Sequence, residues 1–532
     1  MPPAKPSRPA EPATPVTAGP VPGGLEVYVR MYRALAEANG KTDPGYDGML
    51  GDCFLIRMFD SATRRKSHIM IDCGLLMGSV NDKARAKRIA EDIVKTTSSN
   101  ESGPGELDLL VITHEHWDHL SGFSQAQDIL LNPARLRIAN LWMAWTEKDG
   151  DAQADRLRER FDKSGVALAA LSVAIAKSAR TDADRGNVLS ALQGFQGQLS
   201  ADGKIGKALP GREIMRRLKE VTEKSAFLEP GAVLQTPAIA ANGPSIKAFV
   251  LGPPRNEERL FKDKPSSGKK QETYFEAVAF SKLALAALGV DGEPDASSGD
   301  VVEVPFARGY RKISAKDLEA RKNSRAAQGP DEAWLVEHYY GTENTPKTEA
   351  ELIQRRQIGD DWIAAAGPLA LKLDSDTNNT SLVLAFELPG GTVMLFPGDA
   401  QVGNWESWHD QKYRDETGTE HTAEQILNRV QFYKVGHHGS HNATMRQHGL
   451  DMMTRPDLVA AIPTDEAFGK KQGGGWQMPN PRVNQALLER TAGRILRNDR
   501  RYTKSADLEP FGKLAGKDRL TDDILYLEYR VL

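Results

Sequence analysis

The feature that most constrains the fold is a dense group of metal-binding residue types directly after a short apolar run. Leu107 to Thr113 is typical of a strand buried on both faces. His114 to His119, with the sequence HEHWDH, follows at once. Imidazole and carboxylate groups are unfavourable so close to a core unless something compensates them, and a metal ion would compensate all four of these side chains. The pattern therefore predicts a metal site at a strand end.

The spacing within this group indicates two ions. In the extended loop after a strand, alternate residues point the same way. We therefore expect His114 and His116 to bind one ion, and Asp118 and His119 to reach a second. Glu115 should then point away from the metals.

Two later strand ends carry candidate partners for this cluster. Asp399 follows the apolar run Val393 to Phe396, and a carboxylate there can bridge two cations about 3.5–4 Å apart, as two-metal hydrolysis requires. A Gly-Asp pair alone is usually only a turn, so the cluster upstream is what makes this aspartate a candidate ligand. His437 and His438 follow the run Phe432 to Val435, and at least one of them should bind metal.

The order of these motifs resembles the metallo-β-lactamase superfamily: Asp72 at a hairpin exit, then His-x-His-x-Asp-His, Gly-Asp and His-His-Gly-Ser. The chain is also similar to the hydrolase domain of bacterial DNA-uptake competence channel proteins, in pieces that cover about half of it between Leu25 and Asp499. The similar stretches are Gly51 to Cys53, Asn379 to Leu384, Pro397 to Ala400 and Lys434 to Ser440. The resemblance implies an α/β protein built as an αββα sandwich, with two sheets back to back, helices outside and a dinuclear site at one sheet edge.

Carried over by position, the resemblance also implies a ligand set. The residues for the first metal would be His114, His116 and Asp399. The residues for the second metal would be Asp118, His119, Asp399 and one of His437 or His438. His438 is preferred because the family histidine often directly precedes a glycine, and His437 would then contact the ligands rather than the metal.

The chain departs from the family pattern at two places. Most members have a third histidine for the first metal between the cluster and the bridging aspartate, but the only histidine here is His338, in an expected amphipathic helix, Glu332 to Tyr340. Asn378 or Asn379 could stand near the vacant position and leave the first metal weaker or more open. Near the C-terminus, Asn480 precedes a proline where competence-type relatives usually have His-Pro, which weakens any transfer of substrate specificity.

The rest of the chain predicts one interrupted domain after a leader. Residues 1–24 are rich in Pro, Ala and Gly, lack a signal-peptide pattern and predict a disordered leader. Residues 25–532 would form the metallo-β-lactamase-fold domain, with mainly helical insertions at about 126–228 and 255–367. Helices are expected at Val80 to Thr96, Asp155 to Ala179, Arg212 to Ser225 and Glu272 to Leu288. Further core strands are expected at Leu25 to Arg33, Asp52 to Met58, Ser67 to Cys73, Ile246 to Leu251, Thr380 to Glu387, Leu458 to Ile462 and Ile524 to Leu532, and Leu136 to Trp145 could be one more.

Charge and cysteine content limit the partners and the compartment. The 69 basic and 72 acidic residues leave a formal net charge of −3, which gives no strong field for nucleic acid or an anionic membrane. Cys53 and Cys73 are too few for a disulfide framework, so buried thiols in a reducing compartment are expected. The longest nearly apolar stretch, Val166 to Ala176, is about half the length of a membrane span. We therefore expect a cytoplasmic protein without a membrane partner, and the oligomeric state stays open.

The nitrogen-rich ligand set favours two zinc ions, with manganese or iron as alternatives; iron-binding relatives generally have Glu where this chain has His116. Zinc lowers the pKa of its water to about 7, so a metal-bound hydroxide, oriented by Asp118 as the catalytic residue, would need no protein base. The leading hypothesis is hydrolysis of a phosphodiester, in nucleic acid, a nucleotide or another small molecule, because the resemblance is to a domain credited with nuclease chemistry. The alternatives are an ester, thioester or lactone hydrolase of the same fold, and a metal-stabilised binding or regulatory module without turnover.

Overall fold

The computed structural model describes residues 24–33, 51–74, 82–100, 103–162, 210–237, 246–262, 265, 375–472 and 477–532. These residues all belong to one compact unit, which is a mixed α/β structure with two large sheets and two small hairpin sheets. The expected leader up to residue 23, the expected helices at Glu272 to Leu288 and Glu332 to Tyr340, and with the latter His338, lie outside the described residues.

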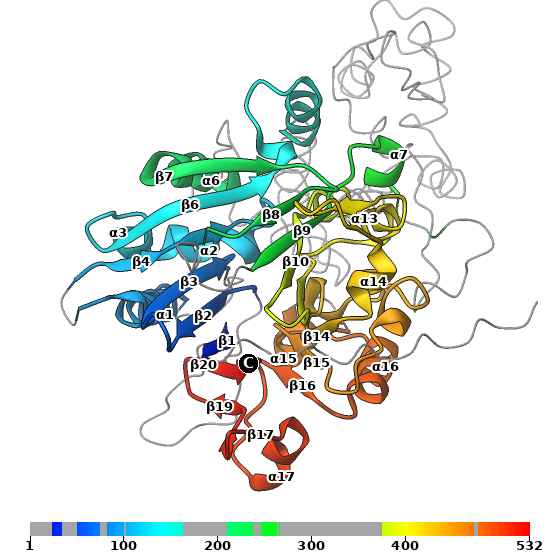
Figure 1. Ribbon diagram of the computed structural model, residues 1–532. Coiled ribbons are helices and arrows are strands. Elements are labelled where there is room, and N and C mark those ends of the chain that lie inside the picture. Colours follow the sequence, from blue (N-terminus) through cyan, green and yellow to red (C-terminus); the bar gives the residue numbers. More distant parts are fainter. Residues whose placement is uncertain are drawn as a thin grey trace, which may run out of the picture. The chain divides into compact units, whose positions relative to one another are not determined.

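The first sheet contains the amino-terminal strands (Figure 1). Its order is β19-β20-β1-β2-β3-β5-β6-β4, and β7 also pairs with β6. The strands β19, β20, β1, β2 and β3 are antiparallel, with Val29 opposite Ile56 and Ile56 opposite Ile69, whereas β3, β5, β6 and β7 run parallel. Its strands are β1 (Leu25–Tyr32), β2 (Phe54–Asp60), β3 (Arg65–Ile71), β4 (Gly105–Leu107), β5 (Leu109–Val111), β6 (Leu136–Ala144), β7 (Thr222–Leu228), β19 (Leu520–Asp522) and β20 (Tyr526–Arg530).

The second sheet contains seven strands in the order β16-β15-β14-β11-β10-β9-β8. From β11 to β16 the neighbours are parallel, so their carboxyl ends lie along the same edge. Its strands are β8 (Val233–Gln235), β9 (Lys247–Gly252), β10 (Val383–Glu387), β11 (Val393–Phe396), β14 (Val430–Lys434), β15 (Val459–Ile462) and β16 (Ile495–Arg497). The small sheets pair β12 (Tyr413–Arg414) with β13 (Glu420–His421), and β17 (Lys513–Leu514) with β18 (Lys517–Asp518).

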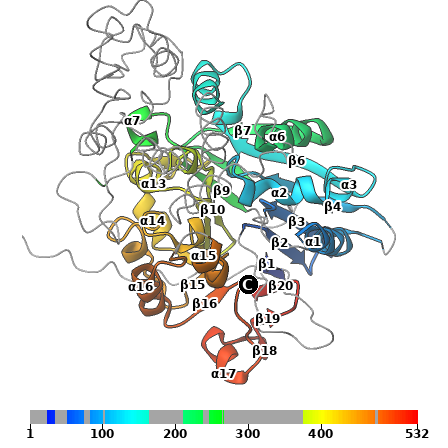
Figure 2. The same cartoon turned by 180° about the vertical axis from the view of Figure 1, so that it is seen from behind.

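Helices cover the outer faces of both sheets (Figure 2). On the first sheet these are α1 (Asp82–Thr97), α2 (Trp117–Gln125), α3 (Gln127–Leu130) and α6 (Pro210–Val221). On the second sheet they are α13 (Val402–Trp408), α14 (Ala423–Leu427) and α16 (Pro481–Thr491). The remaining labelled helices are α7 (Glu257–Leu260), α15 (Glu466–Gln472) and α17 (Ser505–Leu508).

One hydrophobic core is shared by the inner faces of the two sheets. Val29 and Ile56 from the first sheet belong to the same buried cluster as Val250, Leu384 and Phe396 from the second. Alternation along β1 explains this, because every second residue from Leu25 to Val29 is buried and the residues between them are half-buried. The two sheets therefore pack against each other through alternate side chains of their strands.

Most of the expected core strands are confirmed, within a few residues at their ends. The expected helix at Val80 to Thr96 is confirmed as α1, and the possible additional strand at Leu136 to Trp145 is β6. The expected strand at Leu107 to Thr113 is interrupted, because β4 ends at Leu107 and β5 begins at Leu109. At the break, the Asp108 carboxylate accepts a hydrogen bond of 2.8 Å from the backbone N–H of His68 in β3.

Part of the segment expected as an insertion at 126–228 belongs to the core instead. Both β6 and β7 are strands of the first sheet. The helix expected at Arg212 to Ser225 ends at Val221, where the chain continues directly into β7. The apolar stripe of α6, formed by Ile214, Met215 and Leu218, is buried against this sheet. An amphipathic helix that covers a sheet has the same sequence pattern as one in an insertion, which is why its place was wrongly predicted.

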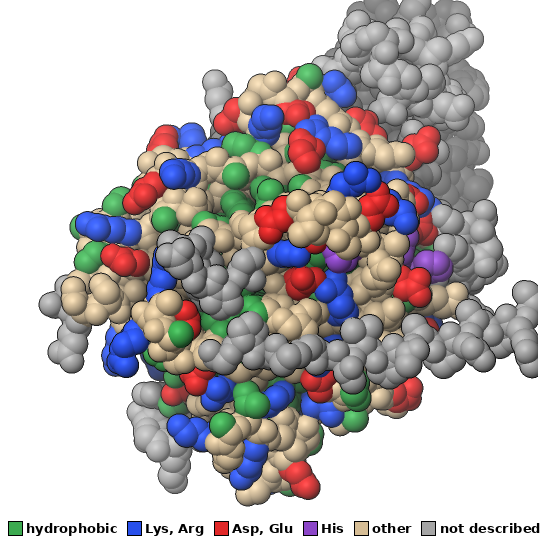
Figure 3. Space-filling model, viewed as in Figure 1, with side chains coloured by type: hydrophobic (Ala, Val, Ile, Leu, Met, Phe, Trp, Pro, Cys, Tyr) green, Lys and Arg blue, Asp and Glu red, His purple; other side chains and the backbone are tan. Residues whose placement is uncertain are grey.

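The surface and the cysteines agree with the composition. Lys/Arg and Asp/Glu side chains are interspersed on the face shown in Figure 3. Cys53 and Cys73 are free and buried, as expected. Among the described residues, no helix has both the length and the apolar character needed to cross a membrane.

Candidate metal centre

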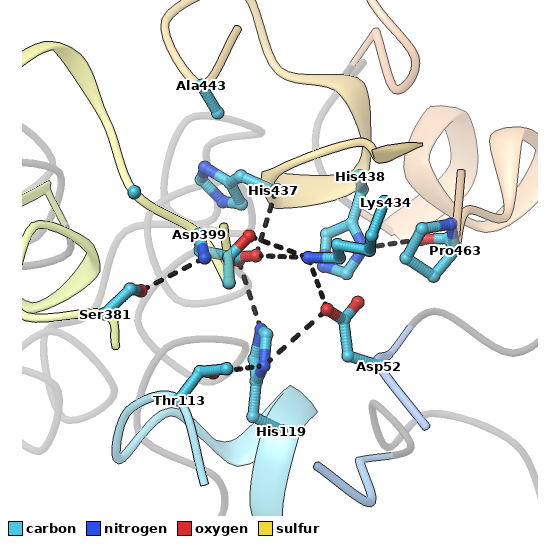
Figure 4. Close-up of polar contacts among 12 residues, drawn as sticks. Asp52, Thr113, His119, Ser381, Asp399, Lys434, His437, His438, Ala443 and Pro463 are labelled. Atoms are coloured by element: carbon cyan, nitrogen blue, oxygen red, sulfur yellow. Dashed lines mark hydrogen bonds and ion pairs between the residues drawn. The ribbon is translucent and has the colours of Figure 1, made fainter. Parts of the chain in front are cut away.

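The predicted site residues lie at the carboxyl ends of strands from both sheets. Figure 4 shows four of them, His119, Asp399, His437 and His438. His114 to His119 lead from β5 into α2, Asp399 follows β11, and His437 and His438 follow β14. Because β11 and β14 are parallel neighbours, these two ends lie side by side. Gly398 makes the turn after β11 with φ +57°, and a Cβ there would come within 3.0 Å of two neighbouring side chains.

Three of the predicted ligands form one tight group. The ligand atoms of His114, His119 and Asp399 all lie within 4.8 Å of one another, and all three residues are buried. Nε2 of His114 and Oδ2 of Asp399 have no hydrogen-bond partner among the described residues. Buried polar atoms without partners are costly, and a cation between these atoms would satisfy them. The donor set therefore fits a metal ion.

A second group consists of Asp118, Asp399 and His438. The Nδ1–H of His438 donates a hydrogen bond of 2.6 Å to the carbonyl oxygen of Pro463. This bond leaves Nε2 facing the site, 2.8 Å from Asp118 Oδ2. A histidine held through one ring nitrogen presents the other to a ligand in a fixed direction. Asp399 belongs to both groups, which is the arrangement expected of a bridging carboxylate.

His119 lies between the two groups. Its Nε2 is 3.2 Å from Asp399 Oδ2 and 3.8 Å from Asp118 Oδ2. The resemblance implies that this histidine belongs to the second metal, whereas the structure groups it with His114 and Asp399. The difference arises because one ring atom lies near the carboxylates of both groups.

Asp72 orients His119. Asp72 follows β3 with φ +54°, and its Oδ2 lies 2.8 Å from His119 Nδ1. Thr113 holds the same carboxylate by donating from its backbone N–H at 2.8 Å and from its hydroxyl at 2.6 Å. The carboxylate therefore fixes the ring so that Nε2 faces the site, as carboxylates commonly do for metal-binding histidines.

The two consecutive histidines after β14 have different contacts. Both adopt left-handed backbone conformations, with φ +43° for His437 and φ +53° for His438. Such conformations are uncommon for residues other than glycine and persist where the surrounding structure enforces them. The backbone N–H of His437 donates to Asp399 Oδ1 at 2.9 Å, while its ring lies near Gln401 and outside both tight groups. His438 is therefore the one that contributes a ring nitrogen.

Of the two asparagines that precede β10, Asn378 is the one beside the histidine cluster. Asn379 is occupied elsewhere, because its Oδ1 accepts from the backbone N–H of Gln401 at 3.0 Å and its Nδ2 donates to the carbonyl oxygen of Lys262 at 3.2 Å. Asn378 is fully buried, and its side chain is in hydrogen-bonding contact with His116. Of the two asparagines considered from the sequence, Asn378 is therefore the one at the first half of the site.

Lys434 and Asp52 belong to the centre, and sequence reasoning assigned neither of them a role. Lys434 Nζ donates to Asp399 Oδ1 at 3.0 Å and to the carbonyl oxygen of Gly398 at 2.8 Å, and it forms a short ion pair with Asp52. The available signal was a lysine between Tyr433 and Val435 at the end of a predicted core strand, since lysine is almost never fully buried unless it is paired.

The electrostatics of the site favour neutral imidazoles on one side and charged groups on the other. Burial lowers the pKa of His116 to about 4 and the pKa of His114 well below its ordinary value, so both rings can offer a lone pair. Burial also acts to lower the pKa of His119, but the surrounding carboxylates, led by Asp399, raise it well above the usual range. Burial acts to raise the pKa of Asp118, but His119 and His438 lower it far below normal.

Two neighbouring side chains are used outside the ligand groups. Glu115 points away from them, as expected, and accepts from Arg212 Nε of α6 at 3.1 Å. Burial raises the pKa of Glu115 to about 7, although Arg212 acts in the opposite direction. Asn480 is the N-cap of α16, and its Oδ1 accepts from the backbone N–H of Arg482 at 3.0 Å.

No protein-family model, curated protein or solved structure matches this chain. What the site can do therefore follows from its own geometry.

Proposed function

We propose that this protein is a metal-dependent hydrolase of the metallo-β-lactamase type that cleaves phosphodiesters with two divalent cations, zinc in the first instance. Two sheets with a shared core and helices on their outer faces support the fold assignment. The observation that carries the proposal is the convergence of three distant segments on two groups of possible ligand atoms, all buried except those of Asp118, that share Asp399. The cations would be held by His114, His116, Asp118, His119, Asp399 and His438.

The cations, when bound, activate water and stabilise the charge that develops on a phosphoryl group. The described side-chain hydroxyls next to the cluster are poorly placed as nucleophiles. Thr113 donates its hydroxyl hydrogen to Asp72, and both Thr113 and Ser381 are buried, so a substrate does not reach their hydroxyls. Water is therefore the proposed attacking group, and a two-cation site suits its in-line attack on phosphorus.

Asp118 is the proposed orienting residue for that water. Its side chain keeps 15% of its exposure, whereas those of Asp52, Asp72 and Asp399 keep 3% or less. It is therefore the carboxylate of this cluster that solvent and substrate can reach. Its far lowered pKa keeps it ionised, so it can accept a hydrogen bond from water near neutral pH.

The test combines metal content with turnover. Elemental analysis of the purified protein should find close to two transition-metal ions per chain, since Asp399 joins two ligand groups. The metal-loaded protein should hydrolyse bis(p-nitrophenyl) phosphate, lose this activity in EDTA and regain it with zinc or manganese. Faster turnover of p-nitrophenyl acetate or of a thioester would favour the carboxylic ester alternative. Bound metal without turnover of any of these substrates would favour a binding module.

A further inference from the structure

Lys434 lies inside the candidate centre, yet the proposed reaction gives it no chemical step. It is the last residue of β14, between Tyr433 and Val435, and keeps only 1% of its exposure. Removing an ammonium group from water is expensive unless its hydrogen bonds and charge are compensated. A lysine in this position therefore needs a specific set of partners.

All three ammonium donors of Lys434 have a partner (Figure 4). Its Nζ contacts the carbonyl oxygen of Gly398, Oδ1 of Asp399 and Oδ2 of Asp52. Gly398 and Asp399 are adjacent in the turn after β11. Asp52 belongs to the other half of the fold, two residues before β2 of the first sheet. The lysine at the end of β14 thus connects two other segments, the turn after β11 and the residues before β2.

The two carboxylate oxygens of Asp399 have different contacts. Oδ1 accepts from Lys434 Nζ at 3.0 Å and from the backbone N–H of His437 at 2.9 Å. Oδ2 has no hydrogen-bond partner among the described residues and lies 3.2 Å from His119 Nε2. The side chain is completely buried, so it cannot rotate into solvent. One oxygen is held by the protein and the other is left for a ligand.

We propose that Lys434 is a positioning residue that holds the Asp399 carboxylate so that Oδ2 alone is presented to both metal groups. This inference rests on the proposed metal binding but does not depend on which bond is hydrolysed. A carboxylate that is already fixed loses less conformational freedom when a cation binds. The lysine therefore increases metal affinity although its ammonium group has the same sign of charge as the metal ion.

A role in charge balance alone makes the opposite prediction. If Lys434 only offsets the buried carboxylates, its removal eliminates repulsion toward the cation and should strengthen metal binding. Removal of the positioning contact should instead weaken it. The sign of the change in affinity therefore distinguishes the two roles.

The experiment measures zinc affinity by competition with a chromogenic chelator, and thermal unfolding of the metal-free protein. Lys434→Met removes the donors but retains an unbranched side chain. We expect its zinc affinity to fall on the order of 10–100-fold, as for other residues that orient metal ligands. An unchanged or increased affinity would overturn the proposal.

Asp52→Asn is the matched control. Asp52 pairs with the same ammonium group as Asp399, so this substitution alters one partner of Lys434 but leaves the bond between Lys434 and Asp399 in place. Its zinc affinity should change much less than that of Lys434→Met. Equal losses in both variants would show that the whole buried network matters, not the hold on Asp399, and would contradict the proposal.

The double variant Lys434→Met/Asp52→Asn keeps the test decisive if Lys434→Met does not fold. It removes one positive and one negative buried charge together, which avoids leaving Asp52 without its cation. We expect it to unfold at a higher temperature than Lys434→Met in the metal-free state and still to show weakened zinc binding. Wild-type zinc affinity in the folded double variant would refute the positioning role. Zinc binding without hydrolysis in the wild type would refute only the proposed function.

Discussion

The two halves of the centre differ in how firmly their ligands are held. In the group formed by Asp118, Asp399 and His438, the protein fixes the histidine through the carbonyl oxygen of Pro463, and Lys434 holds Asp399, which is common to both groups. Each of these bonds is 3.0 Å or shorter and joins groups with complementary donors and acceptors. These bonds fix the direction in which both side chains face the site.

In the group formed by His114, His119 and Asp399, His119 is held by Asp72, but His114 and the neighbouring His116 have weaker support. Nδ1 of His114 lies 3.1 Å from the hydroxyl of Thr113 and 3.3 Å from that of Ser381, and neither hydroxyl is committed to it alone. His116 has Asn378 beside it rather than a third imidazole. The imidazoles of His114 and His116 are therefore less firmly held than that of His438, so we expect the first ion to be bound less tightly.

The largest expected effect is on turnover and comes from the better supported half. Asp118→Ala should reduce phosphodiester hydrolysis on the order of 10²–10⁴-fold, because it removes both a metal ligand and the residue that orients water. The side chain is partly exposed in the first turn of α2, so its loss opens no core cavity. Steady-state kinetics on bis(p-nitrophenyl) phosphate and circular dichroism together check this.

Asp457→Ala is a suitable control for that experiment. Asp457 is another partly exposed aspartate before a strand of the second sheet, and it pairs with Arg455 rather than with a histidine of the centre. Its variant should keep wild-type turnover. If Asp118→Ala also kept full turnover with full metal occupancy, the two-metal mechanism would be wrong.

The second effect concerns the histidine shared by the two halves. Asp72→Asn keeps the size of the side chain. In the wild type, a carboxylate oxygen of Asp72 accepts from His119 Nδ1, whereas the asparagine can turn an amide N–H toward that nitrogen. We expect zinc affinity to fall about 10–100-fold. Asp108→Asn alters a carboxylate that accepts from a backbone N–H in the same sheet, without contact to a predicted ligand, and should leave zinc affinity unchanged. Equal zinc affinities in the two variants would mean that Asp72 does not orient the ring.

The parts of the centre that sequence could predict are those encoded locally. The sequence from His114 to His119 and the residues after β11 and β14 carry their own spacing signals, and the structure brings them together. The choice of His438 over His437 for the tight group also agrees with the geometry, since it depends on the neighbouring glycine and the backbone turn.

The parts that sequence could not predict depend on which strand ends become neighbours. The pairing of Lys434 with Asp52 joins two sheets, and no spacing rule connects residues so far apart in the chain. The place of β7 in the first sheet was missed for the same reason. The sequence of a strand that follows a helix does not indicate which strand it pairs with. Local patterns therefore indicated the candidate ligands, whereas the residues that support them could be identified only from the tertiary structure.

A third, smaller effect tests the difference between the halves directly. Stepwise addition of a chelator to the two-zinc protein should remove one ion before the other. We expect the two dissociation constants to differ on the order of tenfold, which is the lower end of the affinity loss that follows when a metal ligand loses an orienting partner. His116→Ala should abolish the weaker step, and His438→Ala the tighter one. Release of both ions in a single step would show that the two halves bind equally well.

The smallest expected effect should reduce the asymmetry between the halves. Asn378→His places an imidazole at the position where Asn378 contacts His116, and a third nitrogen ligand should tighten the first ion. The gain should be smaller than the losses above, because the new side chain must fit a fully buried position that now holds a smaller one. Asn379→His is the matched control, since Asn379 bonds the backbone of Gln401 and its replacement should destabilise the fold without adding a ligand.

The measurement is the separation between the two zinc release steps, which Asn378→His should narrow. If the separation stayed the same in a folded Asn378→His variant that binds two ions, the weakness of the first half would have to come from the support of His114 and not from the missing histidine.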